Sequence, residues 1–486
     1  MLEKVQSDRL AKLQKIRQLG IDPYGSRYDT AEAIDGILKR YKDDDDAQVA
    51  DAAGRLVLIR DMGKMIFAHI RDESGQMQIA LRKDALDEIS WKLTKLLDLG
   101  DIIDVAGPLK RTKTGEITIW AQRLTLLTKS LNPMPEKFHG LVDVETRYRK
   151  RYLDLMTNPD SLANFKKRVA IIEHFRSLLK ARGFVEVETP MMQSIYGGAA
   201  ARPFVTHHNA LDIDLYMRIS PELYLKRLLV GGMQKVFEIN RNFRNEGLDT
   251  QHNPEFTMLE LYQAYADYDV MMDLTEEIIC LLVAKFCPGN KIEFGNMKVD
   301  FSRPWRRVQY AQLIKEHTGC EIDDIGALRK KAAQLDIDEA GMDDVIVIDA
   351  LFKAAVEDKL VDPTFVIDYP AALCPLTRRK KEDPKYAERF ELYIAQMELA
   401  NAYTELNDPA QQYENFLIQL RGQEDSMARM DNDFINALKY GMPPAGGLGI
   451  GIDRLVMVMT GALSIRDVIL FPLLRPVPEP PVKTGG

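Results

Sequence analysis

Charged and aromatic residues crowd the stretch from residue 241 to residue 260, which reads RNFRNEGLDTQHNPEFTMLE. An ordinary hairpin would carry a short polar turn here, because the segments on both sides have the apolar character of strands. Side chains alternate between the faces of a strand, so Phe256, Met258, Glu260 and Tyr262 are expected on one face. The polar residues expected to converge on the same surface are Arg244, Glu246 and His252.

Two interpretations of this hairpin are open. The first is a solvated hairpin of ion pairs. The second is a site that stacks a flat base and binds phosphates. The second is favoured because a solvated face rarely mixes Phe256 and Met258 with Glu260.

A glycine-rich segment, GGLGIGIDR at residues 446–454, is the next candidate. Gly447, Gly449 and Gly451 alternate, so one side of a strand has no side chains and a flat group can lie against it. The segment lacks the spacing of a dinucleotide fingerprint and the lysine of a phosphate-binding loop. Asp453 is expected to cap the helix that follows, which leaves Arg454 to meet a phosphate or a base.

Two acids in MELANAYTELND, Glu398 and Glu405, could hold Mg²⁺, because a hard cation takes oxygen ligands and often shares them with a nucleotide. Their spacing of seven residues would send them to opposite faces of a flat strand. The metal interpretation therefore requires the strand to break near Asn401. If the strand does not break, the metal interpretation is wrong.

The elements that must position these residues form two parts. Residues 54–130 alternate about five short β-rich runs with one helical stretch near 85–97, which predicts a small Greek-key barrel. Residues 1–53 are expected to form a helical extension before it, and residues 131–145 are expected to form a linker. Residues 146–486 mix hairpins with helices, which predicts an α+β domain on an antiparallel sheet, with a helical insertion near 313–360.

Composition limits the class of protein. With 486 residues, 46% hydrophobic and 28% charged, the chain has an ordinary globular composition and room for two or three domains. We expect a cytoplasmic protein without membrane association, because no apolar stretch could span a bilayer and the charged N-terminal helix is no signal peptide. The net charge of −8 argues against holding nucleic acid by bulk electrostatics but leaves room for local basic faces. The four cysteines have no metal-ligand spacing and are expected to be free thiols.

Taken in order, three segments resemble the signature motifs of class II aminoacyl-tRNA synthetases. They are GFVEVETP at 183–190, FRNE followed by HNPEF, and GGLGIGIDR. Longer stretches, including EKFHGLVDVETRYRKRYLDL, AYTELND and GMPPAGGLGIGIDRL, resemble lysyl-tRNA synthetases of the bacterial type. This resemblance covers nearly the whole chain, including the predicted barrel.

The resemblance implies an OB-fold barrel that binds the anticodon, followed by a class II catalytic domain. It also implies a homodimer formed through the first motif. The family's reaction joins L-lysine to the α-phosphate of ATP, releases pyrophosphate, and passes the lysyl group to the terminal ribose of tRNA(Lys). Mg²⁺ is the implied cofactor.

The resemblance also assigns roles to individual residues. Arg244 would act in catalysis by bridging the lysine carboxylate and the α-phosphate. The residues expected to bind ATP are Arg244, Glu246, His252, Phe256 and Arg454. The residues expected to bind lysine are Gly198, Glu222, Arg244, Glu260, Tyr262 and Asn407. The expected metal ligands are Glu398 and Glu405, and the expected anticodon contacts are Arg60, Phe67, Gln78 and Glu116.

Three alternatives compete with this hypothesis. An aspartyl- or asparaginyl-type synthetase shares the barrel and the motifs, but it needs a cationic or amide-reading pocket rather than one with Glu222 and Glu260. A paralogue that lysylates a protein lacks the N-terminal barrel. A non-catalytic tRNA-binding relative usually loses the motif arginines or the metal acids, and all are present. The chain departs from the family pattern where Cys374 stands in place of a serine, which concerns one wall of the site.

Overall fold

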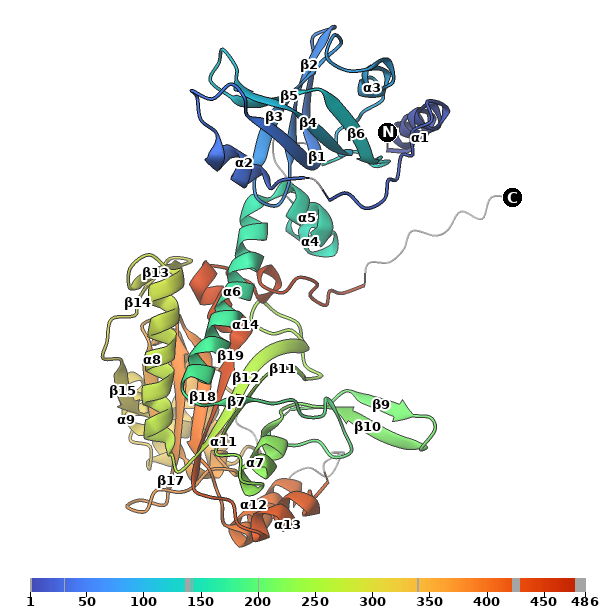
Figure 1. Cartoon of the computed structure of the whole chain (residues 1–486). Helices are drawn as coiled ribbons and strands as arrows, with labels where there is room; N and C mark the ends of the chain where they lie inside the picture. Colours follow the sequence, from blue (N-terminus) through green and yellow to red (C-terminus); the bar gives the residue numbers. More distant parts are fainter. Residues whose placement is uncertain are drawn as a thin grey trace. The chain divides into compact units, whose positions relative to one another are not determined.

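The computed structural model describes residues 2–29, 31–135, 141, 143–199, 201–338, 341–421 and 429–476. The chain divides into two compact units, Met1–Leu141 and Val142–Gly486 (Figure 1). The expected linker at 131–145 spans the division, and residues 136–140 and 142 of it lie outside the described residues.

The first unit contains the expected small barrel. Its elements are α1 (Leu2–Gln18), α2 (Ile34–Arg40), β1 (Val49–Asp61), β2 (Met65–Arg71), β3 (Gln76–Arg82), α3 (Glu88–Thr94), β4 (Ile102–Arg111), β5 (Ile117–Ala121) and β6 (Arg123–Thr128). The strand order β1-β2-β3-β5-β4 closes through β1–β4 pairing, and β6 pairs with β4 outside that ring. The barrel begins earlier than residue 54, because β1 already pairs with β4 at Val49.

The second unit is built on a large sheet. Its strands are β7 (Val185–Glu186), β8 (Met192–Gln193), β9 (Val205–His208), β10 (Ile213–Met217), β11 (Lys235–Phe243), β12 (Glu255–Ala264), β13 (Lys291–Phe294), β14 (Met297–Asp300), β15 (Arg306–Gln309), β16 (Thr364–Pro370), β17 (Tyr386–Ile394), β18 (Met397–Thr404) and β19 (Ala445–Gly451). Eight of them form the order β15-β16-β17-β18-β19-β12-β11-β7.

The helices of this unit are α4 (Val144–Arg149), α5 (Arg151–Thr157), α6 (Pro159–Ala181), α7 (Glu222–Val230), α8 (Tyr268–Phe286), α9 (Tyr310–Thr318), α10 (Ile325–Gln334), α11 (Asp344–Ala355), α12 (Pro409–Arg421), α13 (Asn432–Lys439) and α14 (Ile452–Thr460). Short 3₁₀ turns occur at Glu357–Lys359, Ala371–Leu373 and Ile465–Asp467. The predicted α+β class is confirmed. The sheet is mixed rather than wholly antiparallel, because its outer pairs β7–β11 and β15–β16 are parallel.

The helices expected near 313–360 are α9, α10 and α11, and they connect the parallel neighbours β15 and β16. Parallel strands need a crossover of a dozen or more residues, and these helices form that crossover. They have a core of their own, in which Tyr310, Leu351 and Phe352 are buried.

The two faces of the central sheet differ in chemistry. On one face, apolar side chains such as Leu259, Leu261 and Ile450 pack against α6, α8 and α14 to form the main core (Figure 1). Because side chains alternate, the intervening residues of the same strands point to the other face. That face carries acids, amides and glycines, and it holds the candidate site.

Candidate active site

The charged stretch connects β11 to β12, which pair in register from Lys235 opposite Gln263 to Phe243 opposite Glu255. The Arg244 guanidinium lies over the Phe256 ring, 5.1 Å from its centre. The Arg244 amide donates to the carbonyl of Pro254 at 2.9 Å, which closes the base of the loop. Glu246 is exposed in this loop. The structure therefore brings Arg244 and Phe256 together, with Glu246 at the rim.

His252 and Arg454 meet across the same site, although they are far apart in the sequence. Arg454 Nη2 lies 2.9 Å from His252 Nε2, and His252 Nδ1 lies 2.7 Å from Asp249 Oδ2. A guanidinium can only donate, so Nε2 accepts and the ring proton sits on Nδ1 toward Asp249. Arg454 also donates through Nη1 to the carbonyl of Glu398 at 2.6 Å. Arg454 thereby connects the hairpin loop to β18.

Asp453 does not cap α14 as expected. The cap position is Gly451, without a side-chain hydrogen bond. Asp453 is buried instead: it accepts from the Thr257 amide at 2.7 Å and pairs with Arg168 at 2.6 Å. Packing against β12 and α6 therefore outweighs the local capping preference.

Ser220 lies one residue before the cap position of α7, which is Pro221. Its hydroxyl accepts from the Glu222 amide at 3.1 Å and donates to the Glu260 carboxylate at 3.1 Å.

Glu398 in β18 and Glu405, just beyond the end of β18, fall on one face because the strand contains a bulge. Leu392 pairs with Ala400 and Tyr393 with Glu398, so Leu399 is an extra residue in the ladder. The extra residue reverses the alternation, and Glu398 falls on the same face as Glu405 despite the odd spacing. The expected break near Asn401 is thus a bulge at Leu399.

The alternating glycines form the floor of the site. Gly447 pairs with Tyr262 on one side and with Tyr403 on the other. A Cβ atom at Gly447 would overlap Glu405 Oε1 and lie 2.6 Å from Tyr262 Cε1. The two side chains therefore lie directly over the glycine backbone, which only glycine permits.

A buried charge cluster occupies the α7 end of this floor. Lys226, which is fully buried, donates to Glu222 Oε1 at 2.6 Å and forms an ion pair with Glu405. Its ammonium also lies 6.0 Å from the centre of the Tyr262 ring. Gly198 closes the pocket: its φ is +87°, and a Cβ there would lie 2.9 Å from Glu222 Cβ.

Burial perturbs the acids of this cluster. Burial, reinforced by the negative charge of Glu222, raises the pKa of Glu260 to about 8. Burial also raises the pKa of Glu405 to about 8, although Lys226 opposes that shift. Burial alone would lower the pKa of Lys226, but Glu222 and Glu405 outweigh it and the net shift is upward. The raised pKa values mean that the pocket disfavours uncompensated negative charge, so a bound cation would stabilise the ionised form of these acids.

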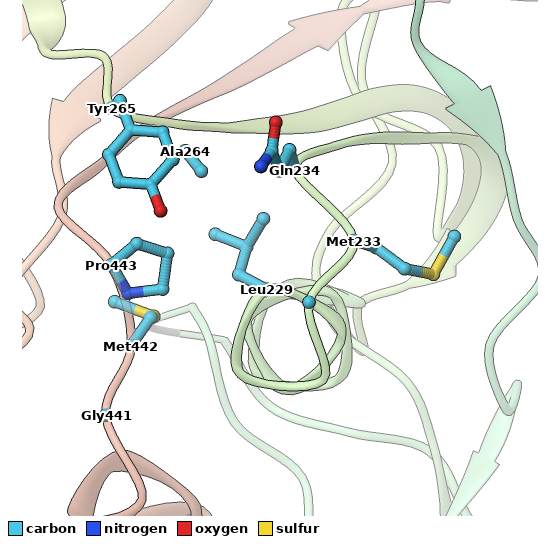
Figure 2. Close-up of a pocket in the computed structure, with 9 residues that line it drawn as sticks. Leu229, Met233, Gln234, Ala264, Tyr265, Gly441, Met442 and Pro443 are labelled. Atoms are coloured by element: carbon cyan, nitrogen blue, oxygen red, sulfur yellow. The ribbon is translucent and has the colours of Figure 1, made fainter.

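Asn407 is at the edge of the pocket, where its side chain donates to the carbonyl of Met442 at 3.2 Å. Beyond it lies a cavity of about 420 Å³ (Figure 2). Figure 2 shows Leu229, Met442 and Pro443 around this cavity with the polar ends of Gln234 and Tyr265. Among the described residues, none of the predicted site residues lines this cavity.

Lys226, Tyr403 and Asn401 belong to the polar face but were missed by sequence reasoning. Lys226 follows Glu222 by one helical turn, and Tyr403 precedes Glu405 by two strand positions. Both spacings can be recognised in the sequence. The ion pair between Lys226 and Glu405 cannot be predicted from the sequence, because it joins residues from distant elements.

Cys374 adjoins the same face. Its buried thiol lies 3.3 Å from Arg389 Nη1, and burial raises its pKa. The Arg389 guanidinium lies over Tyr403, 5.4 Å from the ring centre. All four cysteines are free, as expected.

The predicted anticodon residues gather on one outer surface of the barrel. Arg60 pairs with Phe67 across β1 and β2, and Phe67 meets Trp120 edge-to-face with 6.2 Å between ring centres. In the next row, Glu116 accepts from Gln78 at 2.7 Å and lies 2.6 Å from His69 Nε2. His69 and Trp120 were not predicted.

Comparison with known proteins identifies the class of both units. A family model described as tRNA synthetases class II (D, K and N) matches residues 143–475. A second model, an OB-fold nucleic acid binding domain, matches residues 52–127. The chain is therefore a class II tRNA synthetase with an OB-fold domain.

Curated relatives narrow the class to one family. The chain is 51% identical to a lysine–tRNA ligase of Pelotomaculum thermopropionicum over 98% of this chain and 96% of that protein. It is 52% identical to a lysine–tRNA ligase of Carboxydothermus hydrogenoformans over 96% of this chain and 97% of that protein. A lysine–tRNA ligase of Thermosipho melanesiensis is 46% identical over 98% of this chain. The chain belongs to the lysine–tRNA ligase family.

Proposed function

We propose that the chain activates L-lysine with ATP to form lysyl-adenylate and pyrophosphate, and then transfers the lysyl group to the 3′-terminal ribose of tRNA(Lys). The observation that carries this proposal is the polar sheet face. Two arginines lie at one end of it, and a buried cluster of acids lies at the other. This arrangement suits a substrate with phosphates at one end and an ammonium at the other.

The chemistry at the arginine end is positioning and charge stabilisation. Lysine's own carboxylate is the nucleophile, so no general base is needed. Arg244 would neutralise charge that develops between the carboxylate and the α-phosphate. Arg244 stays aligned because its guanidinium lies over the Phe256 ring. Phe256 and Arg454 would hold the adenine between them. Glu246 would contact the edge of the adenine, and His252 would lie near the outer phosphates.

The acidic end would bind the substrate's ammonium groups. Tyr262 and Tyr403 pair with Gly447 from either side, and we propose that these aromatic residues contact the methylene chain of lysine. Glu222 would receive the ε-ammonium and Glu260 the α-ammonium, with Gly198 and Asn407 at the pocket edge.

Mg²⁺ is the proposed cofactor, held by Glu398 and Glu405. The fit rests on the bulge, which puts both carboxylates on one face, and on Glu405 Oε1, which is buried without a hydrogen-bond partner. Among the described residues, no group of three or more His, Cys, Asp or Glu could hold a metal. Nucleotide phosphates would supply the other oxygens, and the ion would neutralise their charge.

The barrel is proposed to bind the anticodon. Phe67 would stack a base, and Arg60, Gln78 and Glu116 would contact base edges. The hydrogen bonds of Gln78 and Glu116 fix these two side chains before any RNA binds.

A homodimer is proposed through the first motif. Val169 on α6, Val185 on β7 and Met192 on β8 are 65%, 51% and 56% exposed, which is unusual for apolar residues near a sheet edge. A second copy would cover them.

Among the described helices, none is long and apolar enough to cross a membrane. We propose that the protein acts in the cytoplasm, where its substrates are.

Lysine-dependent exchange of pyrophosphate into ATP tests the proposed function. The purified protein should catalyse exchange with lysine but not with aspartate or asparagine. Arg244→Met should lower exchange by about 100-fold or more, the usual loss when a group that stabilises developing charge is removed. Exchange that depends on aspartate or asparagine would favour a related synthetase. Absence of exchange with any amino acid would favour a non-catalytic tRNA-binding protein.

A further inference from the structure

The resident ammonium of Lys226 is an unusual feature of this site. Lys226 is fully buried, and both of its carboxylate partners are buried as well. Glu222 lies on the same helix, α7, whereas Glu405 lies just beyond β18. The single ammonium therefore fixes the position of two acids that come from different elements.

Lys226 also reduces the electrostatic repulsion between the buried carboxylates of the pocket. Two carboxylates held close together in a buried site repel each other strongly, because little water screens them. A buried ammonium between them removes that repulsion and allows both to remain in place.

We propose that Lys226 is a positioning residue of the lysine pocket, which holds the Glu222 carboxylate in the place where it receives the substrate's side-chain ammonium. This inference rests on the proposed function, because it assigns Glu222 to lysine binding. The proposed role differs from that of a purely structural ion pair. A structural ion pair would affect stability alone, whereas the proposed role affects recognition of lysine.

Lys226→Met is the direct test, because methionine keeps much of the side-chain length and removes the charge. The KM for lysine in pyrophosphate exchange should rise by about 10-fold or more, since Glu222 loses the ammonium that holds it. The KM for ATP, measured at saturating Mg²⁺, should stay within about 2-fold, because Arg244, Phe256 and Arg454 do not contact Lys226 and excess Mg²⁺ offsets any disturbance of Glu405. An unchanged KM for lysine in a folded Lys226→Met protein overturns the proposal, and so does an equal rise for both substrates.

Arg227→Met is the matched control on the same helix. Arg227 pairs with Asp431 and Asp433 rather than with pocket residues. Its loss should leave both KM values within about 2-fold of the wild type. If Arg227→Met raises the KM for lysine as much as Lys226→Met does, general disturbance of α7 explains the effect and the proposal fails.

A second comparison applies if Lys226→Met does not fold. Combining Lys226→Met with Glu405→Gln removes one buried charge of each sign. The double variant is compared with Glu405→Gln alone. The KM for lysine should be several-fold higher in the double variant, because Glu222 has lost its anchor. Equal values overturn the proposal. Failure of the proposed function is distinguishable from both outcomes, because the wild-type protein itself would then show no lysine-dependent exchange.

Discussion

Gly447→Ala is expected to damage the lysine pocket through a single methyl group. The added Cβ would overlap Glu405 Oε1 and lie 2.6 Å from Tyr262 Cε1. Neither side chain has free space to move into, because Glu405 is tied to Lys226 and Tyr262 is 4% exposed. Overpacking of this kind costs about 1–3 kcal/mol. The loss of glycine entropy in the unfolded chain offsets only about 0.4–1 kcal/mol of that.

Two neighbouring glycines provide a graded comparison on the same face of β19. A Cβ at Gly449 would lie 3.1 Å from Asn401 Oδ1 and 3.2 Å from Met258 Cε, a contact that the flexible methionine can relieve. A Cβ at Gly451 would have no neighbour closer than 3.6 Å. The loss of stability should therefore fall in the order Gly447→Ala, Gly449→Ala, Gly451→Ala, with the last close to zero.

Thermal unfolding and pyrophosphate exchange measure the two consequences. Gly447→Ala should lower the unfolding midpoint and raise the KM for lysine about 10-fold or more, which corresponds to a loss of about 1.4 kcal/mol of binding. Gly451→Ala should affect the KM for ATP more than that for lysine, because Arg454 is its neighbour. The reasoning is refuted if Gly447→Ala matches the wild type in both measurements, or if Gly451→Ala is the less stable of the two.

Three further outcomes are expected. Glu222→Gln should raise the KM for lysine on the order of 100-fold with ATP binding little changed, because a charge-assisted hydrogen bond is lost; an unchanged KM for lysine contradicts the pocket assignment. Glu405→Gln should reduce pyrophosphate exchange most strongly at low Mg²⁺, and near-normal exchange there would exclude Glu405 as a metal ligand. Phe67→Ala should weaken charging of tRNA(Lys) by about 1–3 kcal/mol per stacked base while lysine activation remains nearly intact. Equal loss of both steps would contradict the division of labour between the two units.

Local periodicity was enough to predict much of the fold. The alternation in β2 puts Ile66, Ala68 and Ile70 inside the barrel and leaves Phe67 and His69 outside. Along β12, the same period separates Leu259 and Leu261 from Glu260 and Tyr262. Such patterns are local properties of the chain, because each residue's face follows from its position in the strand.

At some positions, tertiary packing overrides the structural preference of the local sequence. Asp453 has the side chain of a helix cap, yet it is buried against Thr257 and Arg168. The helices between β15 and β16 resemble an insertion in the sequence, because nothing local shows that the strands they join are parallel neighbours. In both cases a distant contact outweighs the local signal.

The sequence by itself determined which residues carry charge, which glycines leave a strand face bare, and which side chains alternate onto one surface. Only the tertiary structure decided that Glu398 and Glu405 share a face, because a bulge at Leu399 is a property of strand pairing. It also decided that Lys226 joins Glu222 to Glu405, a contact between α7 and the end of β18. The physical reason is that periodicity orients a side chain relative to its own element. Which elements meet depends on how the whole chain buries its apolar faces.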